Sequence, residues 1–412
     1  MGLLELIYLV GISISIFQVG NYWTASAIVL ILGIIVLICE CLLNKKIPKR
    51  IFNSYLIFLF LWFIWSLLSK LWVVDQELWS RNNYYMLIVV GYGLLTAYLV
   101  YSDKALRKVF TLFYLSTVIH VLIGFFEILT GIYFFTANYL NVGWYSSEGW
   151  PVSFFYNTND FATYLLFAFI VILYFDFDSF KSTYFNQILK KFRPILLIFI
   201  LLNVIATESR LILATLLLVM IIYGYLHIKP KYKWLIHIPT FSLIFSIVAL
   251  GLTTFSSEIF NAITADSSGS SRTTLINSGL ALLKESPLLG IGAGNFEYYS
   301  MNFIQFRSGQ IFTMHNWWIE NLTHYGIPFF LVYIFYYGKK LWESFRLAFK
   351  SKSQVAMLCF TWLVAFIPGS IVSSNNFDDI WIWIVNSIIF SLLIKELKKN
   401  KEGVQEDASL LR

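Results

Sequence analysis

Arg210, Arg272 and His315 lie in or beside short polar segments of an otherwise apolar chain. Side chains of these types suggest phosphate chemistry. A helix is predicted to start after Ser270 or Ser271, which puts Arg272 in its first turn, and to stop at Ser286-Pro287. An arginine in that turn faces the positive end of the helix dipole, which is unfavourable unless an anion lies nearby. Because helix starts bind phosphate through free N–H groups and guanidinium groups bind it bidentately, this segment predicts an anion clamp.

Arg210 stands in the stretch ATESRLILATLLL, at the mouth of a predicted membrane span. It can be interpreted as an interfacial arginine whose charged head reaches water. It can also be interpreted as a cation at the membrane surface that holds an anionic headgroup, since ionisable residues at such depth are often functional. Arg272 alone is typical of a solvated loop. Together with Arg210 and the helix start, it forms a candidate pyrophosphate site.

His315 and Asn316 open a second predicted short helix, which ends at Tyr325-Gly326. A single histidine is usually structural, but His315 lies close in sequence to the proposed clamp. A neutral imidazole there could take a proton from a hydroxyl nucleophile. Glu320 could orient a partner or pair with Asn316 four residues before it, and both interpretations stay open.

Several other kinds of site are not supported. The run Gly290–Gly294 follows no predicted strand and lacks the Gly-Lys-Ser/Thr ending of a nucleotide loop, so we expect a tight turn with close backbone packing. Cys39, Cys41 and Cys359 fall inside apolar segments without zinc-ligand spacing and are interpreted as small core residues. No motif predicts a bound metal, and we expect no cofactor.

The composition is that of an all-α integral membrane protein. Of the 412 residues 58% are hydrophobic and only 13% are charged, which is about half the charged share of a soluble protein. At about 20 residues per span, the chain has room for about twelve transmembrane helices. The predicted spans are residues 3–19, 23–43, 51–69, 86–101, 109–133, 160–177, 194–207, 211–228, 235–254, 326–338, 355–372 and 380–394.

The basic residues divide the breaks between these spans into two alternating sets. One set contains 24 of the 30 lysines and arginines, while the other has only Lys70, Arg81, Arg210, Arg272, Lys284 and Arg307. The positive-inside rule then predicts that both termini are cytoplasmic and that the segment Ser256–Pro328 is extracytoplasmic. The net charge of +7 is therefore mainly a topology signal and does not indicate a nucleic-acid partner.

The apolar spans and the distribution of basic residues divide the chain into four predicted parts. Residues 1–254 hold transmembrane helices 1–9, and residues 255–325 form a large extracytoplasmic catalytic loop with short helices. Residues 326–394 hold helices 10–12, and residues 395–412 form a cytoplasmic tail. The aromatic-rich run at 141–160 also lies on the outer side, where it suits a lid or a sugar-stacking surface.

Four stretches of this chain resemble the O-antigen ligase and polymerase superfamily. They read FFYNTNDFATYLL, SRLILATLLL, SRTTLINSGLALLKESPLLGIGAGNF and MHNWWIENLTHYGIP, in that order. The superfamily includes Wzy-type polymerases of capsule and O-antigen, WaaL-type ligases and teichuronic acid polymerases. The resemblance implies a GT-C-type architecture in the bacterial inner (cytoplasmic) membrane. It also implies a metal-independent glycosyltransferase whose donor is an undecaprenyl-pyrophosphate-linked glycan.

The resemblance implies roles for individual residues. In enzymes of this kind two arginines hold the pyrophosphate and a loop histidine activates the acceptor hydroxyl; these roles carry over to Arg210, Arg272 and His315. Paired arginines suit a pyrophosphate leaving group because they stabilise its growing negative charge. Further candidates for substrate binding are Arg81, Asn159, Asn316 and Glu320.

The activity that we expect is polymerisation of a surface polysaccharide such as capsule, O-antigen or a teichuronic-acid-like polymer. The acceptor would be the non-reducing end of a second lipid-linked repeat unit. One alternative is a ligase that moves finished polymer to lipid A-core or another envelope acceptor. Another is a flippase or transporter, but no inverted repeat is detectable and few charges line a midplane path. Candidate partners are the lipid bilayer, a flippase and a chain-length regulator.

Overall fold

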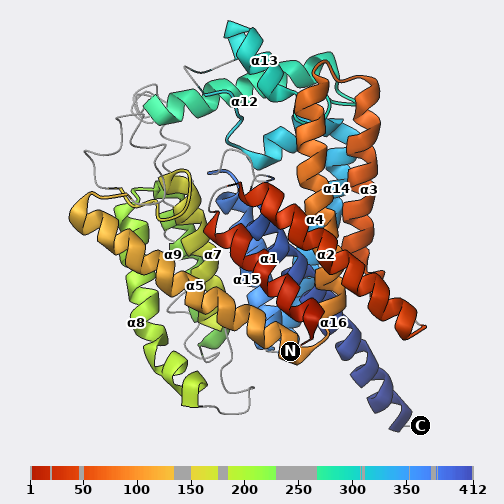
Figure 1. Ribbon diagram of the computed structural model, residues 1–412, viewed down its shortest axis with the longest axis vertical. Helices are drawn as coiled ribbons and strands as arrows, with labels where there is room; N and C mark the ends of the chain where they lie inside the picture. Colours follow the sequence, from red (N-terminus) through yellow and green to blue (C-terminus); the bar gives the residue numbers. More distant parts are fainter. Residues whose placement is uncertain are drawn as a thin grey trace.

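The computed structural model describes residues 2–18, 21–45, 51–133, 150–174, 184–228, 267–306, 308, 311–351, 353–372, 377 and 379–410. Within these ranges the chain is helical, and the one β-bridge is an isolated contact between Ser308 and Ile311 (Figure 1). The elements, in chain order, are α1 (Leu3–Phe17), α2 (Tyr22–Leu43), α3 (Ser54–Leu68), η2 (Ser69–Leu71), α4 (Gln76–Leu99), α5 (Asp103–Thr130), α7 (Thr158–Tyr174), α8 (Tyr184–Ala206), α9 (Arg210–His227), α12 (Ser267–Glu285), α13 (Phe296–Asn302), η4 (Ile304–Phe306), α14 (Trp317–Ser351), α15 (Gln354–Gly369) and α16 (Ile380–Leu410).

These helices agree with a multi-pass membrane protein. Among the described residues, five helical segments are long and apolar enough to cross a membrane, at Tyr22–Leu43, Ser54–Leu71, Asp103–Thr130, Arg210–His227 and Ile380–Glu402. The helices α1, α7 and α15 are apolar but shorter. The predicted span 235–254 lies outside the described residues, as do residues 141–149 of the aromatic-rich run. The count of twelve, the GT-C arrangement and the domain boundaries therefore stay predictions.

Side-chain caps explain where several of these helices begin. Asn21, Asn53, Asp75, Ser102 and Ser353 each accept a hydrogen bond from a backbone N–H group in the first turn that follows. Such caps satisfy donors that have no partner within the helix. Each cap stands directly before the helix that it starts, so local sequence and hydropathy together set these starts.

The helix ends lie on two opposite faces of the bundle. On the first, which we call the site face, Gln18 after α1 donates to Asp379 before α16 at 2.9 Å. On the second, the basic face, Lys395 of α16 pairs with Asp103 of α5 at 2.8 Å, and Lys108 pairs with Glu5 of α1. The stretch of α16 from Asp379 to Lys395 separates the faces by about 24 Å at 1.5 Å per residue, close to the thickness of a hydrocarbon core.

α7 is the central helix. Nearly all of its side chains are buried, and it packs against α5, α8, α9 and α15. It runs antiparallel to α15, because Tyr174 at its end bonds Thr361 at 2.8 Å while Phe167 contacts Phe366 further along α15. The start of α7 and the end of α15 therefore both lie on the site face.

The helix α12 lies across the end of the bundle at the site face, with α13 above it (Figure 1). Leu275 and Leu282 are seven residues apart, on one side of α12, and both are buried. They pack with Ile291, Phe296 and Met314 in a small core that is separate from the main one. This core holds the polar segment between residues 267 and 316 as a folded layer over the spans.

Candidate functional site

The glycine run is the tight turn that its sequence predicts. Gly290, Gly292 and Gly294 have φ angles of +70°, +89° and +74°, a region that glycine enters without a steric penalty. Ile291 donates its backbone N–H to Thr323 at 2.9 Å, and a Cβ on Gly290 would lie 2.6 Å from that same carbonyl oxygen. The turn thus packs its backbone directly on the first part of α14.

That first part of α14 is a short helix, as predicted. It begins at Trp317, and the chain leaves helical geometry at Gly326, with φ 78° and ψ 170°. Asn316 caps it, because its Oδ1 accepts from the N–H groups of Trp318 at 3.1 Å and Ile319 at 3.2 Å. The Asn316 oxygen is therefore engaged in orienting the helix, which leaves its amide nitrogen as the group for a ligand.

His315 is held in an uncommon conformation directly before this helix. Its φ of +48° lies in the left-handed region, where backbone strain is often associated with function. Its imidazole is bonded to the backbone of Val372, and its Nδ1 is buried with no hydrogen-bond partner among the described residues. Burial and the positive charge of Arg272 lower the pKa of His315 to about 4. The ring is therefore neutral at pH 7 and can accept a proton.

Arg272 is near His315, but its place in the helix differs from the prediction. Because α12 begins at Ser267, Arg272 lies in the second turn and not in the first. The serine-rich stretch was interpreted as the residues before the helix, yet it is itself helical. Arg272 is partly buried, and its charge acts on the imidazole. The prediction that Arg272 lies in the first turn of its helix is therefore wrong.

Arg210, in contrast, stands at a helix start. It is the first residue of α9 and is exposed, with Ser209 before it. Ser209 donates its hydroxyl to Oδ1 of Asn159 at 3.0 Å, so the start of α7 is joined to the start of α9. The site face thus brings Arg272 close to His315, and Asn159 close to the positive end of α9.

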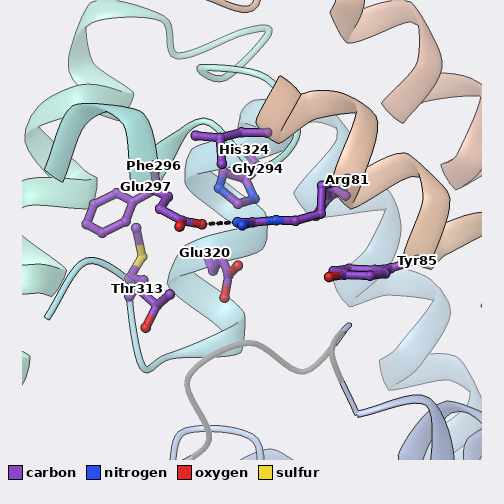
Figure 2. A pocket seen from close by; sticks show the side chains of 11 residues that line it. Arg81, Tyr85, Gly294, Phe296, Glu297, Thr313, Glu320 and His324 are labelled. Carbon is purple, nitrogen blue, oxygen red and sulfur yellow. Dashed lines mark hydrogen bonds and ion pairs between the residues drawn. The ribbon is translucent and has the colours of Figure 1, made fainter. Parts of the chain in front are cut away.

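Arg81, Glu320 and His324 line a pocket on the same face (Figure 2). It has about 350 Å³ of empty space, part of it open to solvent. Arg81 on α4 forms an ion pair with Glu297 on α13 at its rim. The lining residues are Leu78, Arg81, Asn82, Tyr85, Gly294, Phe296, Glu297, Thr313, Met314, Glu320 and His324.

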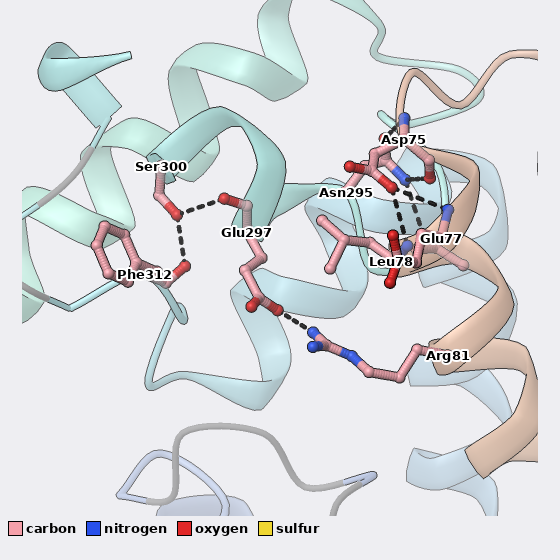
Figure 3. Close-up of polar contacts among 9 residues, drawn as sticks. Asp75, Glu77, Leu78, Arg81, Asn295, Glu297, Ser300 and Phe312 are labelled. Atoms are coloured by element: carbon pink, nitrogen blue, oxygen red, sulfur yellow. Dashed lines mark hydrogen bonds and ion pairs between the residues drawn. The ribbon is translucent and has the colours of Figure 1, made fainter. Parts of the chain in front are cut away.

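A network of hydrogen bonds fixes this rim (Figure 3). Oδ1 of Asn295 accepts from the N–H groups of Val74 at 3.1 Å and Asp75 at 2.9 Å, where the chain enters α4. Ser300 donates to the carbonyl of Phe312 at 2.6 Å. The polar segment after α12 is therefore hydrogen-bonded both to the start of α4 and to the segment that leads to His315.

His324 and Glu297 were not assigned a role from sequence. The spacing of Glu320 and His324 was a usable signal, because residues four apart lie on one side of a helix. Glu297 offered none, since its partner Arg81 is 216 residues away. Among the described residues, no group of three or more histidine, cysteine or acidic side chains could hold a metal, and Cys39, Cys41 and Cys359 are free thiols.

Comparison with known proteins shows which family the region around this site is similar to. Residues 195–334, which include Arg210, Arg272 and His315, match the O-antigen ligase family. The teichuronic acid biosynthesis protein TuaE of Bacillus subtilis (strain 168) is 23% identical over 370 residues, which cover 85% of this chain and 73% of TuaE. These matches confirm the resemblance to the O-antigen ligase and polymerase superfamily.

Proposed function

We propose that this relative of the O-antigen ligases and polymerases is a membrane glycosyltransferase that polymerises lipid-linked repeat units of a surface polysaccharide. The donor would be an undecaprenyl-pyrophosphate-linked glycan. The observation that carries this proposal is the proximity of Arg272 to a neutral, partly buried His315, within the region that matches the O-antigen ligase family. The similarity to TuaE adds an envelope polysaccharide as the class of product.

In the proposed reaction, a hydroxyl oxygen of the acceptor attacks C1 of the donor sugar. The bond between C1 and the phosphate oxygen breaks, and undecaprenyl pyrophosphate leaves with that electron pair. Arg272 and Arg210 would hold the leaving group, because guanidinium groups pair with phosphate oxygens through two parallel bonds. Arg210 is the first residue of α9, so the N–H groups at the start of that helix would also bind the phosphate.

His315 would take the proton of the acceptor hydroxyl. Its bond to the backbone of Val372 leaves Nδ1 as the ring nitrogen without a partner among the described residues. If Nε2 donates to that carbonyl, the neutral ring has its lone pair on Nδ1, which makes this atom the base. An imidazole that is neutral at pH 7 can act in this way, although a pKa near 4 makes it a weaker base than an unperturbed histidine.

The ligase is the second candidate, and the family description favours it. The two functions share the donor and the departure of the lipid pyrophosphate, and they differ in the acceptor. A polymerase adds repeat units to another lipid-linked glycan, whereas a ligase transfers a finished chain to a different envelope molecule. The same three residues would serve either reaction.

We also propose a location and partners. The site face would be extracytoplasmic and both termini cytoplasmic, in the bacterial cytoplasmic membrane, because 24 of the 30 lysines and arginines fall in one of the two alternating sets of breaks between the predicted spans. A flippase would deliver the donor to the site face, and a chain-length regulator would act on the product. Asn159, Arg81 and Glu320 would contact the glycans.

Reconstitution tests the proposal. Lipid-linked repeat units would be extracted from source cells that lack this gene, and mixed with the purified protein in liposomes. A polymerase produces a ladder of products that differ by one repeat unit, with free undecaprenyl pyrophosphate. Transfer only to an added envelope acceptor would indicate a ligase, and no transfer to either acceptor would contradict the glycosyltransferase.

A further inference from the structure

Glu127 has no role in the steps above, although a carboxyl group inside a predicted membrane span is uncommon and often functional. It lies near the end of α5 that reaches the site face, and it is fully buried. We propose that Glu127 is a positioning residue for donor binding, which fixes the segment before α7 and, through the starts of α7 and α9, the place of Arg210. This inference rests on the proposed function and deepens it, because it says what holds one part of the pyrophosphate clamp.

The segment 150–157 is the first reason. It is not helical, yet Val152, Ser153 and Phe155 are fully buried. The backbone groups of a buried, non-helical segment need partners from the surrounding protein. Oε2 of Glu127 supplies them, because it accepts from the N–H groups of Val152 and Ser153, both at 2.8 Å. The carboxyl group therefore holds two consecutive peptide groups at the place where the chain turns towards α7.

The conformation of Ser153 is the second reason. Its φ of +53° lies in the left-handed region, which is unfavourable for residues other than glycine and persists only where the surroundings impose it. Glu127 accepts the Ser153 N–H, and Nδ1 of His120 is hydrogen-bonded to the Ser153 hydroxyl at 2.9 Å. His120 and Glu127 are seven residues apart, so they lie on one side of α5. That side of α5 therefore imposes the turn at Ser153.

The connection from this turn to Arg210 is the third reason. α7 begins at Thr158, whose hydroxyl donates to the carbonyl of Thr207 at 3.4 Å. The next residue, Asn159, accepts from the hydroxyl of Ser209 at 3.0 Å, and Arg210 follows Ser209 directly. α7 packs against α5, α8 and α9, and these four helices lie on one side of the bundle (Figure 1). A shift of the turn before α7 would therefore move the start of α9.

Arg272 has a different support. It lies on α12, whose buried side packs with Ile291, Phe296 and Met314 in the small core that is separate from the main one. The proposed clamp thus consists of two arginines that are held by different parts of the protein. A change at Glu127 should therefore act on the Arg210 part of the clamp and leave the Arg272 part in place.

Binding of undecaprenyl pyrophosphate to the protein in nanodiscs tests the proposal without any transfer reaction. Glu127→Leu removes the accepting oxygen at similar volume, so the Kd should rise by about tenfold, as expected when two buried N–H groups lose their partner. Glu127→Gln keeps an accepting oxygen and should retain most of the affinity. A wild type that does not bind this lipid would overturn the proposal.

Glu40→Leu is the matched control. Glu40, near the end of α2, also accepts a hydrogen bond through a carboxyl oxygen, from the hydroxyl of Tyr98 at 3.0 Å. Because that contact lies near the basic face, the Glu40→Leu protein should bind the lipid as the wild type does. Thermal unfolding in the same nanodiscs shows whether each variant is folded. An unchanged Kd in a folded Glu127→Leu protein would overturn the proposal.

A double-mutant comparison shows whether the effect passes through Arg210. Glu127→Leu should weaken binding by about tenfold in the Arg272→Gln background. In the Arg210→Gln background the loss should be less than about threefold, because the effects of residues that act as a unit are not additive. Equal losses in the two backgrounds would overturn the proposal, since they would indicate a general change in the fold.

Ser209→Ala keeps the test decisive if Glu127→Leu does not fold. This variant removes only the hydrogen bond to Asn159, which is the last link before Arg210. It should weaken binding by about threefold or more in the wild-type and Arg272→Gln backgrounds and have little effect in the Arg210→Gln background. The same Kd as the wild type in a folded Ser209→Ala protein would overturn the proposed route to Arg210.

A kinetic measurement separates this inference from the function on which it rests. In the reconstituted reaction, Glu127→Leu should raise the donor KM by about tenfold and leave the acceptor KM unchanged. A protein that transfers glycan with an unchanged donor KM in this variant would contradict only the role of Glu127. A wild type that binds undecaprenyl pyrophosphate in the predicted Glu127-dependent way but transfers nothing would contradict only the glycosyltransferase.

Discussion

At the residue scale, the arginines and the histidine could be selected from sequence, but their surroundings could not. The run MHNWW predicted a helix that opens at His315 and Asn316, whereas the helix begins at Trp317 and both residues precede it. Its φ of +48° and its bond to the backbone of Val372 depend on tertiary contacts more than 50 residues apart in the chain. Arg272 was placed in a first turn because serines usually precede helices, whereas here they continue one.

The titration of His315 is a prediction at this scale. Since its folded-state pKa lies near 4, below the ordinary histidine value of about 6.5, the ring should stay neutral as pH falls through 6.5 and gain a proton near pH 4. NMR of ring-labelled histidine, assigned with His315→Ala, measures this midpoint. Replacing Arg272 with glutamine should raise it, because a positive neighbour is removed. A midpoint at 6.5 in the wild type would contradict the buried environment.

The acid limb of the transfer rate should follow that midpoint. A general base works only while unprotonated, so the rate should depend little on pH above pH 5 and fall as pH drops through about 4. A profile of rate against pH in liposomes measures it, with protein integrity checked at each pH. Bound pyrophosphate would raise the pKa of the ring, so the profile should be taken on the free enzyme as kcat/KM.

The arginines give a third prediction at this scale. Arg210→Lys and Arg272→Lys keep the charge but lose the planar pair of N–H donors, so each should reduce transfer by about tenfold or more. Arg107→Lys, at the opposite end of the bundle on α5, is the matched control and should retain activity. Wild-type rates in both site variants would leave only the interfacial and loop interpretations of these arginines.

At the element scale, hydropathy located helices but not their bounds. The predicted span 86–101 corresponds to α4, which begins ten residues earlier at Gln76, where Asp75 caps it. Likewise, the span 326–338 is part of α14, which continues to Ser351 beyond its kink. Hydropathy reports where apolar side chains are needed, whereas a helix continues as long as its backbone bonds are favourable. The polar turns of α4 beyond the apolar stretch are the ones that supply Arg81 to the pocket.

The glycine turn gives a prediction for this scale. Gly290→Ala would place a Cβ at 2.5 Å from backbone atoms of His324, in a conformation with φ +70°. We expect a loss of stability of roughly 2 kcal/mol or more. The left-handed backbone strain of alanine adds to a clash with backbone atoms, which no side-chain movement can relieve. Gly338→Ala in α14 meets no atom within 4 Å and serves as control. Thermal unfolding in detergent compares them; equal midpoints would contradict the close packing of this turn.

At the scale of the whole molecule, the main feature is that the helix ends lie on two opposite faces, the site face and the basic face. The alternation of basic breaks predicted that consecutive helices run in opposite directions, so that their ends form two groups. The contacts within the site face and within the basic face agree with these two groups. What could not be predicted is which outer segments meet. The joining of Asn159 with Ser209, and of Arg81 with Glu297, depends on how the helices pack and has no local signal.

Sidedness is the prediction at this scale. In a protein whose three cysteines are replaced, Thr273→Cys on α12 should react with an impermeant thiol reagent added to intact cells. Asn400→Cys at the end of α16 should react only after the membrane is opened. Both positions are exposed, so access to the reagent decides the outcome. Labelling of Asn400→Cys from outside would reverse the orientation and remove the extracytoplasmic site.

The most direct test of the central claim is single-turnover transfer by His315→Ala at saturating donor, with donor binding measured in parallel. If His315 takes the proton of the acceptor hydroxyl, the rate should fall by roughly 10²–10⁴-fold while the protein stays folded and binds the lipid-linked donor as the wild type does. A His315→Ala protein that keeps the wild-type rate would contradict the account.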